Sequence, residues 1–221
     1  MLAAFAGSAL TAVVLLFFRS GKGAKTTSSG APASTGALAP GQTRPPTAAG
    51  VELTRLIDAG RSQTFHGRYQ ATSTDPAAAG SQVTLDLWRK PPREREELLQ
   101  VSGGRSVRSA GFLLPPISVL CRQADANAAW TCANTPQTQA DDLLKGVTGD
   151  VAGQAAAVRD DTVASRPVRC FGVPGAQPSE LCLTPQGITA RLTTGSSKIE
   201  LVDLSFDVPD DVFAPPATPT P

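Results

Sequence analysis

The stretch that decides the fold runs from Val83 to Leu99 and reads VTLDLWRKPPREREELL. Apolar residues alternate with other residues over its first half, which is the period of a half-buried β-strand. Lys90-Pro91-Pro92 then removes two backbone donors and ends that strand. A second extended run with interleaved charges begins at Arg93. We therefore predict two antiparallel strands joined at a proline corner, in a sheet on which the folded domain is built.

Composition divides the 221-residue chain into four parts. Residues 1–18 contain no charged side chain, and residues 19–49 are mostly Gly, Ser, Thr, Ala and Pro with scattered basic residues. Such a linker cannot bury enough apolar surface to offset its ordering entropy, so we expect it to be disordered. Residues 50–215 hold the folded domain, and the Pro-Thr tail at 216–221 is expected to be disordered too.

The N-terminal segment is either a transmembrane anchor or the apolar core of a signal peptide. A helix over residues 1–18 would span roughly 27 Å, which is just enough for a bilayer core. Arg19, Lys22 and Lys25 follow directly, which argues against cleavage there. The positive-inside rule would place these residues and the domain in the cytoplasm, whereas the cysteines indicate the opposite side. We follow the cysteines and predict a single-pass cell-membrane protein with an extracytoplasmic domain.

Four cysteines lie in the second half of the chain, in two close pairs. An even number in an exported domain indicates disulfides, and four cysteines allow three connectivities. We favour Cys121–Cys132 and Cys170–Cys182, because each closes a hairpin-sized loop; each bridge would contribute roughly 3 kcal/mol. Metal ligation is disfavoured, because the chain has one histidine and no C-x2-C motif.

Further strands and helices follow from periodicity and turn residues. An amphipathic helix is predicted over Val51, Leu53, Leu56 and Ile57, with Gly60 just past its end. Two mid-chain helices are predicted, one from Thr135-Pro136 to Gly146 and one over about 151–158, packed on one face of the sheet. Additional strands are predicted at 64–69, 106–114, 118–121, 129–132, 168–171, 181–183, 188–192 and 199–206.

No pattern in the chain indicates catalysis, a cofactor or nucleic-acid binding. The net charge of +1 provides no field that would attract nucleic acid. His66 is the only histidine and no G-x-S-x-G motif is present, so we expect no enzyme. Asp141-Asp142 and Asp160-Asp161 are interpreted as residues that flank helices or lie in solvated loops. Trp88 and Trp130 are expected in a core or cavity wall.

The proline corner carries a family resemblance. Leu87-Trp88-Arg89-Lys90-Pro91-Pro92 followed by Arg93 or Arg95 resembles the L-W-x-K-x-P corner of the bacterial LolA-like superfamily of lipoprotein carriers and lipid-binding lipoproteins. The order of predicted elements over about 51–215 and the terminal V-x-x-x-x-F also fit that superfamily. The two cysteine pairs resemble those of its actinobacterial extracytoplasmic members.

The resemblance implies an α+β fold: a strongly curved antiparallel sheet, or incomplete β-barrel, with helices covering its concave face. It implies that Arg93 or Arg95 tethers the helical lid. It also implies an apolar cavity, although alternation alone leaves open whether the Leu85 and Leu87 face or the Trp88 face lines it. The cavity candidates are Leu85, Leu87, Trp88, Trp130, Leu143 and Leu144.

Two functions are therefore expected from the sequence. The first is a membrane-tethered, non-enzymatic module without a cofactor that binds a lipid, a lipoprotein or another apolar ligand in the sheet cavity. The alternative is an envelope protein-interaction or sensing module without bound lipid, as in anti-sigma-factor regulators that resemble this fold. Glu94, Glu96 and Glu97 stand where carriers have apolar residues, which argues against lipoprotein shuttling.

Overall fold

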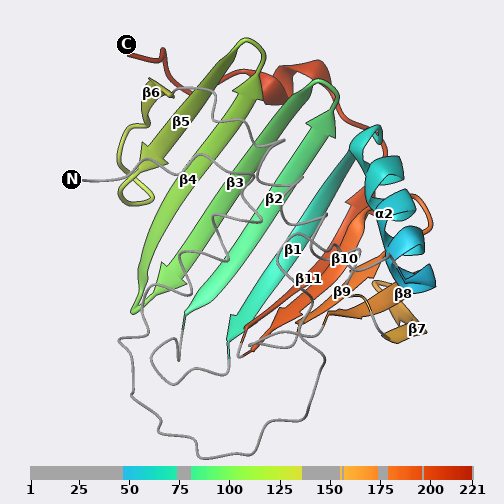
Figure 1. Cartoon of the computed structure of the whole chain (residues 1–221). Coiled ribbons are helices and arrows are strands. Elements are labelled where there is room, and N and C mark those ends of the chain that lie inside the picture. Colours follow the sequence, from blue (N-terminus) through green and yellow to red (C-terminus); the bar gives the residue numbers. More distant parts are fainter. Residues whose placement is uncertain are drawn as a thin grey trace, which may run out of the picture.

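The computed structural model describes residues 47–73, 81–135, 155, 157–173, 179–195 and 197–220. Within these ranges one α-helix precedes eleven strands and a short 3-10 helix (Figure 1). The elements are α2 (Ala48–Arg61), β1 (Phe65–Ser73), β2 (Gln82–Lys90), β3 (Arg93–Ser102), β4 (Arg105–Leu114), β5 (Ile117–Gln123), β6 (Thr131–Thr135), β7 (Ala157–Val163), β8 (Arg166–Val173), β9 (Ser179–Leu183), β10 (Thr189–Thr194), β11 (Ser197–Ser205) and η2 (Asp210–Phe213).

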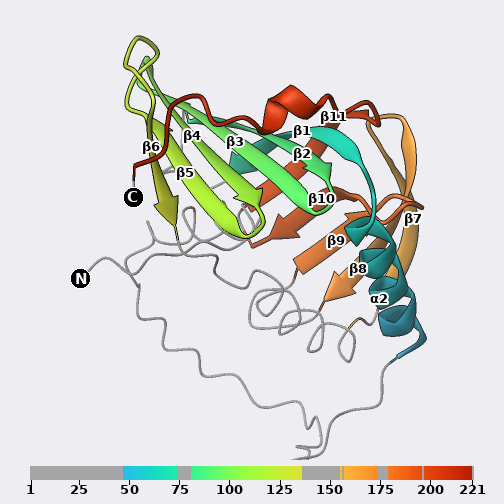
Figure 2. The same cartoon turned by 90° about the horizontal axis from the view of Figure 1, so that it is seen from above.

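All eleven strands form one antiparallel sheet that is not closed into a barrel. Their order is β6-β5-β4-β3-β2-β1-β11-β10-β9-β8-β7, so β6 and β7 are its two edges. Figure 2 shows that the sheet bends, with β8 and β9 turned away from the plane of β3–β5. The α+β class and the curved antiparallel sheet are thus confirmed. Of the helices expected on the concave face, the one from Thr135-Pro136 to Gly146 does not begin at Thr135, which ends strand β6; residues 136–146 lie outside the described residues.

The predicted proline corner is confirmed. β2 and β3 pair antiparallel in one continuous register from Lys90 opposite Arg93 to Gln82 opposite Val101. Alternation explains this register, because slipping it by one residue would turn Leu85 and Leu87 out of the core.

The helix predicted over about 151–158 is wrong at its C-terminal end. Ala157–Val163 is strand β7, which pairs with β8 in a hairpin, and Asp160 and Asp161 lie within it rather than beside a helix. The hairpin turn places Ala164 and Ser165 at φ values of 49° and 60°. Positive φ at both central residues suits the twist of a two-residue hairpin loop, but neither residue type signals it in the sequence.

Helix α2 begins three residues before Val51, the first residue predicted to be helical, and Gly60 lies inside it rather than past its end. Thr47 caps its start, and its Oγ1 accepts a hydrogen bond from the backbone N–H of Gly50 at 3.0 Å. Leu53 and Leu56 pack with Phe171 and Leu183, so α2 lies against β8 and β9. None of the described helices is long and apolar enough to cross a membrane; residues 1–18 lie outside the described ranges.

Besides the cluster under α2, two hydrophobic cores pack against the rest of the sheet. The larger contains side chains from β1, β2 and the β8–β11 strands, among them Leu85, Leu87, Tyr69 and Leu201. The smaller lies at the β6 side of the sheet and consists of Ala110, Phe112, Val119, Cys121 and Cys132. Both predicted disulfides, Cys121–Cys132 and Cys170–Cys182, are confirmed.

The C-terminal tail, expected to be disordered, is placed against β6 as far as Thr220. The N–H of Asn134 donates to the Thr220 carbonyl at 2.9 Å, and the N–H of Thr220 donates to the Cys132 carbonyl at 3.0 Å. Ala217 packs against the smaller core. The tail is held because an edge strand offers unpaired backbone groups, which the composition of the tail does not reveal.

Candidate functional site

The two faces of the β2–β5 sheet have different surroundings. We call the face that carries Leu85 and Leu87 the leucine face, and the opposite face, which carries Trp88, the tryptophan face. The β2–β3 register places Leu98 opposite Leu85 and Glu96 opposite Leu87 on the leucine face. The same register places Arg95 opposite Trp88 on the tryptophan face.

At β2 the leucine face is buried in the hydrophobic core of the protein. Leu85 and Leu87 are 2% and 4% exposed, and both belong to the core that contains Tyr69 and Leu201. Leu98 of β3 packs against the same core. The cavity candidates Leu85 and Leu87 are therefore core residues in the described structure.

Further from β2 the leucine face becomes more open. Its register runs from Glu96 through Gly111 and Leu120 to Ala133, across β3, β4, β5 and β6. Among the described residues, a Cβ added at Gly111 would meet one atom within 4 Å, the Oε2 of Glu96 at 3.9 Å. Leu120 is 38% exposed and Val107, on the same face of β4, is 49% exposed. We call Glu96, Val107, Gly111 and Leu120 the outer leucine face.

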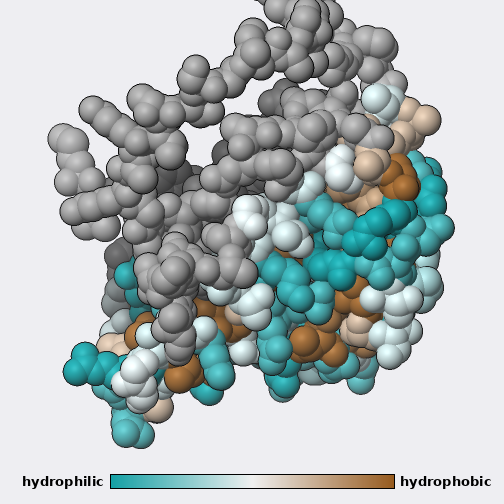
Figure 3. Space-filling model, turned by 90° about the horizontal axis from the view of Figure 1, so that it is seen from below, coloured by the Kyte–Doolittle hydropathy of each residue, from teal (hydrophilic) through white to brown (hydrophobic). Residues whose placement is uncertain are grey.

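Carboxylates are mixed with the apolar residues of this face. Glu94 lies on it two residues before Glu96, and its Oε2 accepts a hydrogen bond from the Nε of Arg89 at 2.7 Å. In the view from below, hydrophobic patches are set among hydrophilic side chains over the coloured part of the surface (Figure 3). Leu120, Val107 and Glu96 together give the outer leucine face both apolar contact and charge.

The tryptophan face carries a ladder of stacked groups. The rings of His66 and Trp88 are parallel with centroids 4.6 Å apart. The Arg95 guanidinium lies 4.6 Å from the Trp88 centroid and 5.3 Å from that of Phe112. Cation–π contacts of this kind stabilise a site by about 0.5–2 kcal/mol each. This ladder links β1, β2, β3 and β4 side by side.

His66 is engaged structurally in this ladder. Its Nε2 lies 2.8 Å from Oδ1 of Asp86, which also accepts a hydrogen bond from the Nε of Arg68 at 2.9 Å. Burial alone would raise the pKa of Asp86, but the hydrogen bonds from His66 and Arg68 outweigh it and lower the pKa below its usual value.

Arg93 and Arg95, the predicted lid tethers, both contact the C-terminal η2 segment. The Nη1 of Arg95 donates to the carbonyl of Val212 at 2.8 Å. Arg93 forms an ion pair with Asp210 and lies 4.7 Å from the Phe213 ring centroid. The predicted lid at 136–146 lies outside the described residues, so the tethering of that lid stays a prediction.

The remaining cavity candidates separate in space. Trp88 lies on the tryptophan face, and Trp130 packs against the smaller core next to Cys121–Cys132. Leu143 and Leu144 lie outside the described residues. The structure thus brings Trp88, Arg93 and Arg95 together near η2, on the face opposite Leu85 and Leu87.

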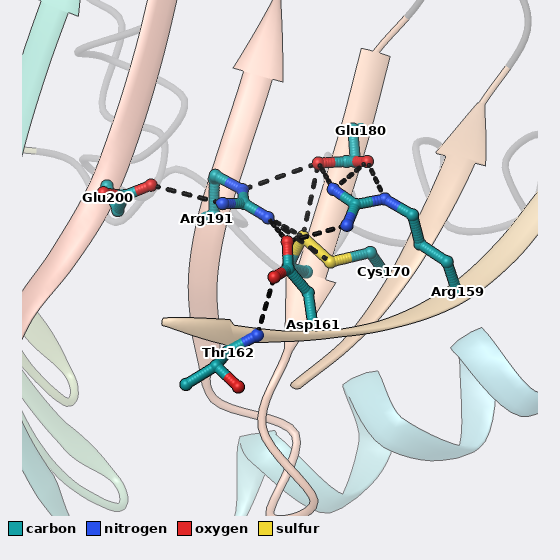
Figure 4. The surroundings of a disulfide bond; sticks show 8 residues. Arg159, Asp161, Thr162, Cys170, Glu180, Arg191 and Glu200 are labelled. Carbon is teal, nitrogen blue, oxygen red and sulfur yellow. Dashed lines mark hydrogen bonds and ion pairs between the residues drawn. A yellow bond between two sulfur atoms is a disulfide. The ribbon is translucent and has the colours of Figure 1, made fainter. Parts of the chain in front are cut away.

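A charged network that the sequence did not indicate covers the second disulfide (Figure 4). Arg191 of β10 pairs with Asp161 of β7 and Glu200 of β11, and its Nη2 lies 3.6 Å from the Sγ of Cys182. Arg159 adds hydrogen bonds to Asp161 and Glu180.

Asp161 is the central carboxylate of this network. The backbone N–H of Thr162 lowers its pKa most, followed by hydrogen bonds from Arg159 and Arg191, so the pKa lies well below the usual range. Cys170, Glu180 and Cys182 are close enough to resemble a metal-ligand set. Because the two sulfurs are joined in a disulfide, they offer no thiolate to a metal.

Comparison with solved structures shows the fold. A chain of the Pseudomonas aeruginosa MucA/MucB complex matches with a TM-score of 0.50 and 19% identity, over 76% of this chain and 61% of that chain. The fold is LolA-like. A structure of MucB in complex with MucA(peri) matches with a TM-score of 0.46 and 18% identity, over 72% of this chain and 56% of that chain. LprF from Mycobacterium bovis matches with a TM-score of 0.46 and 12% identity, over 78% of this chain and 99% of that chain.

These matches extend to the fold and no further. This LolA-like chain spans about six-tenths of the length of the chains matched in the two MucA and MucB complexes. No family model matches the sequence, and no curated protein matches it.

Proposed function

We propose that the protein is a non-enzymatic interaction module that binds a protein partner of the cell envelope through its outer leucine face. The module is held at the membrane by residues 1–18 and lies on the extracytoplasmic side. Two disulfides support this location, because such bridges persist in oxidising compartments.

The mixed character of the outer leucine face carries the proposal. Gly111 has no side chain, and it lies between Glu96 and Leu120 on this face, where the Leu120 side chain is 38% exposed. Moving the Glu96 carboxylate out of water against an acyl chain carries a desolvation cost of several kcal/mol, which disfavours a purely apolar ligand. A protein partner can place an apolar side chain over Gly111 and keep polar groups or water next to the Glu96 carboxylate.

The matched fold gives independent support for a partner of this kind. A chain with the same fold assembles in the Pseudomonas aeruginosa MucA/MucB complex. We extend this type of assembly, a LolA-like sheet bound to a second protein, to the present chain.

A second candidate, a lipid or another apolar ligand, is favoured by one observation. Val107 and Leu120 are exposed large hydrophobic residues on the same face of adjacent strands, and Leu98 lies on that face of β3. An acyl chain could follow this row toward the core around Leu85. In this case Glu94 and Glu96 would lie at the rim of the ligand site.

Matched substitutions on β5 test the first candidate against the second. Leu120 and Ile117 are both exposed, at 38% and 49%, but they lie on opposite faces of the strand. The Leu120→Asp and Ile117→Asp variants are expressed as full chains in the native host, crosslinked, and purified from membranes. Recovered proteins and lipids are then quantified by mass spectrometry.

We expect the wild type and Ile117→Asp to retain one protein partner. Leu120→Asp should recover at least about tenfold less of this partner, which corresponds to a loss of about 1.4 kcal/mol in binding free energy. Equal recovery of the partner by all three chains would contradict the proposed face. About one lipid molecule per chain, lost in Leu120→Asp and without a protein partner, would establish the second candidate instead.

A further inference from the structure

Strand β6 is an edge of the sheet without the usual protection of an edge. In the described part of the chain, its only strand neighbour is β5. Its sequence, Thr131-Cys132-Ala133-Asn134-Thr135, contains no charged residue and no proline. Proteins normally protect exposed edges with charge, proline, bulges or a covering segment, because an unprotected edge pairs with other chains. The protection of β6 must therefore come from elsewhere.

The disulfide shows which backbone groups of β6 face outward. Cys132 lies directly opposite Cys121 with a Cα–Cα distance of 4.0 Å. So short a distance marks a pair that exchanges no ladder hydrogen bonds, so the N–H and C=O of Cys132 point away from β5. Asn134, two residues further, presents its N–H and C=O to the same side.

The C-terminal segment uses two of these four outward groups. Thr220 accepts from the N–H of Asn134 at 2.9 Å and donates to the carbonyl of Cys132 at 3.0 Å. Ala217 anchors the segment on the smaller core, beside the disulfide. In Figures 1 and 2 the C-terminal end lies beside β6 in both views. Prolines at 215, 216 and 219 have no N–H to donate, so the segment cannot continue as a regular strand.

We propose that residues Ala214–Thr220 form a strap that occupies the edge of β6, and that release of the strap allows β6 to pair with β6 of a second copy of this chain. The proposal is independent of the outer leucine face, since it concerns the backbone edge of the sheet.

The geometry of β6 suits pairing with itself. In an antiparallel pair centred on Ala133, Cys132 of each copy lies opposite Asn134 of the other. The outward N–H and C=O groups of these residues then form four backbone hydrogen bonds, whereas the strap makes two backbone bonds and one from the Thr220 hydroxyl to the Cys132 carbonyl. The central residue is alanine, and no charged side chain lies on either strand to oppose pairing. The two eleven-stranded sheets would become continuous.

The test uses full-length chains in mild detergent, because residues 1–18 are apolar. Ala217→Asp places a charge against the smaller core and should release the strap, whereas Thr218→Asp, at the exposed neighbouring position, should leave it in place. Sedimentation in density-matched detergent measures the oligomeric state over a hundredfold range of concentration, and hydrogen exchange measures protection of the Asn134 amide.

We expect Ala217→Asp to form a concentration-dependent dimer. In dilute samples its Asn134 amide should exchange at least about tenfold faster than in the wild type. The Thr218→Asp chain should sediment like the wild type, as a monomer. Asn134→Pro removes an outward donor without touching the β5 ladder, so Ala217→Asp combined with Asn134→Pro should be monomeric.

Two results would overturn the proposal. The first is an Ala217→Asp chain that stays monomeric at every concentration. If its Asn134 amide exchanges fast, the exposed edge does not pair. If that amide stays protected, Ala217 does not hold the strap. A dimer that persists in the combined variant would place the contact on another surface.

Discussion

Arg95 contacts two aromatic rings and a backbone carbonyl at once, and a lysine cannot do the same. Its planar guanidinium lies against Trp88 and Phe112 while Nη1 donates to Val212. We expect Arg95→Lys to lower the free energy of unfolding by about 1–2 kcal/mol in urea titrations, because both stacking contacts weaken. Arg105→Lys, at the exposed start of β4, is the control and should change it by less than about 0.5 kcal/mol. Equal effects would show that the Arg95 contacts add no stability.

Asp161 makes the stability of the protein depend on pH in the acid range. Its pKa lies below the usual value when the protein is folded, so its contribution is fully present above the unfolded pKa of about 3.9. The contribution is lost as the pH falls through the folded pKa. The difference in unfolding free energy between the wild type and Asp161→Asn should therefore be constant from about pH 7 to pH 5 and narrow below about pH 4.

Urea titrations at several pH values measure this difference. Asp207→Asn, outside the network around Arg191, serves as the control variant. A difference that stays unchanged down to about pH 3 would contradict the assigned role of Asp161.

At the scale of elements, the docking of α2 depends on a turn between β9 and β10. Gly187 adopts φ +80°, and a Cβ there would lie 1.8 Å from the carbonyl oxygen of Leu56 in α2. We expect Gly187→Ala to lower the free energy of unfolding by about 3 kcal/mol or more, because backbone strain and a backbone clash act together. Urea unfolding and hydrogen exchange of the α2 amides measure the loss.

Gly104→Ala is the matched control for this change. Gly104 also has positive φ, at +75°, but a Cβ there meets nothing within 4 Å. Substitution of Gly104 should lower the free energy of unfolding by about 1 kcal/mol, because of the backbone conformation alone. It should leave hydrogen exchange of the α2 amides unchanged. A similar loss in both variants would show that the turn does not hold α2.

Across the whole molecule, the parts that follow from local pattern were predicted and the long-range parts were not. The β2–β3 corner follows from strict alternation around Pro91-Pro92, and the disulfides follow from loop size. Strand β7 was missed because its alanine-rich approach suits a helix and its turn at Ala164-Ser165 lacks glycine or asparagine.

The contacts of the candidate site were beyond sequence reasoning for a different reason. Arg93 and Asp210 are 117 residues apart, and no local period links them. The openness of the outer leucine face depends on Gly111 lying between Glu96 and Leu120, which requires the register of three strands. The sequence predicted that β2 would separate two faces, but only the structure shows that Leu85 and Leu87 face the core.

The most direct test of the proposed function is photo-crosslinking from the outer leucine face in living cells. A photoreactive phenylalanine analogue replaces Leu120 in one chain and Ile117, on the opposite face of β5, in the other. Mass spectrometry then identifies what each position captures. The account predicts a peptide from one envelope protein attached at position 120 and absent at position 117. Lipid adducts at position 120, or the same protein captured equally from both positions, would contradict it.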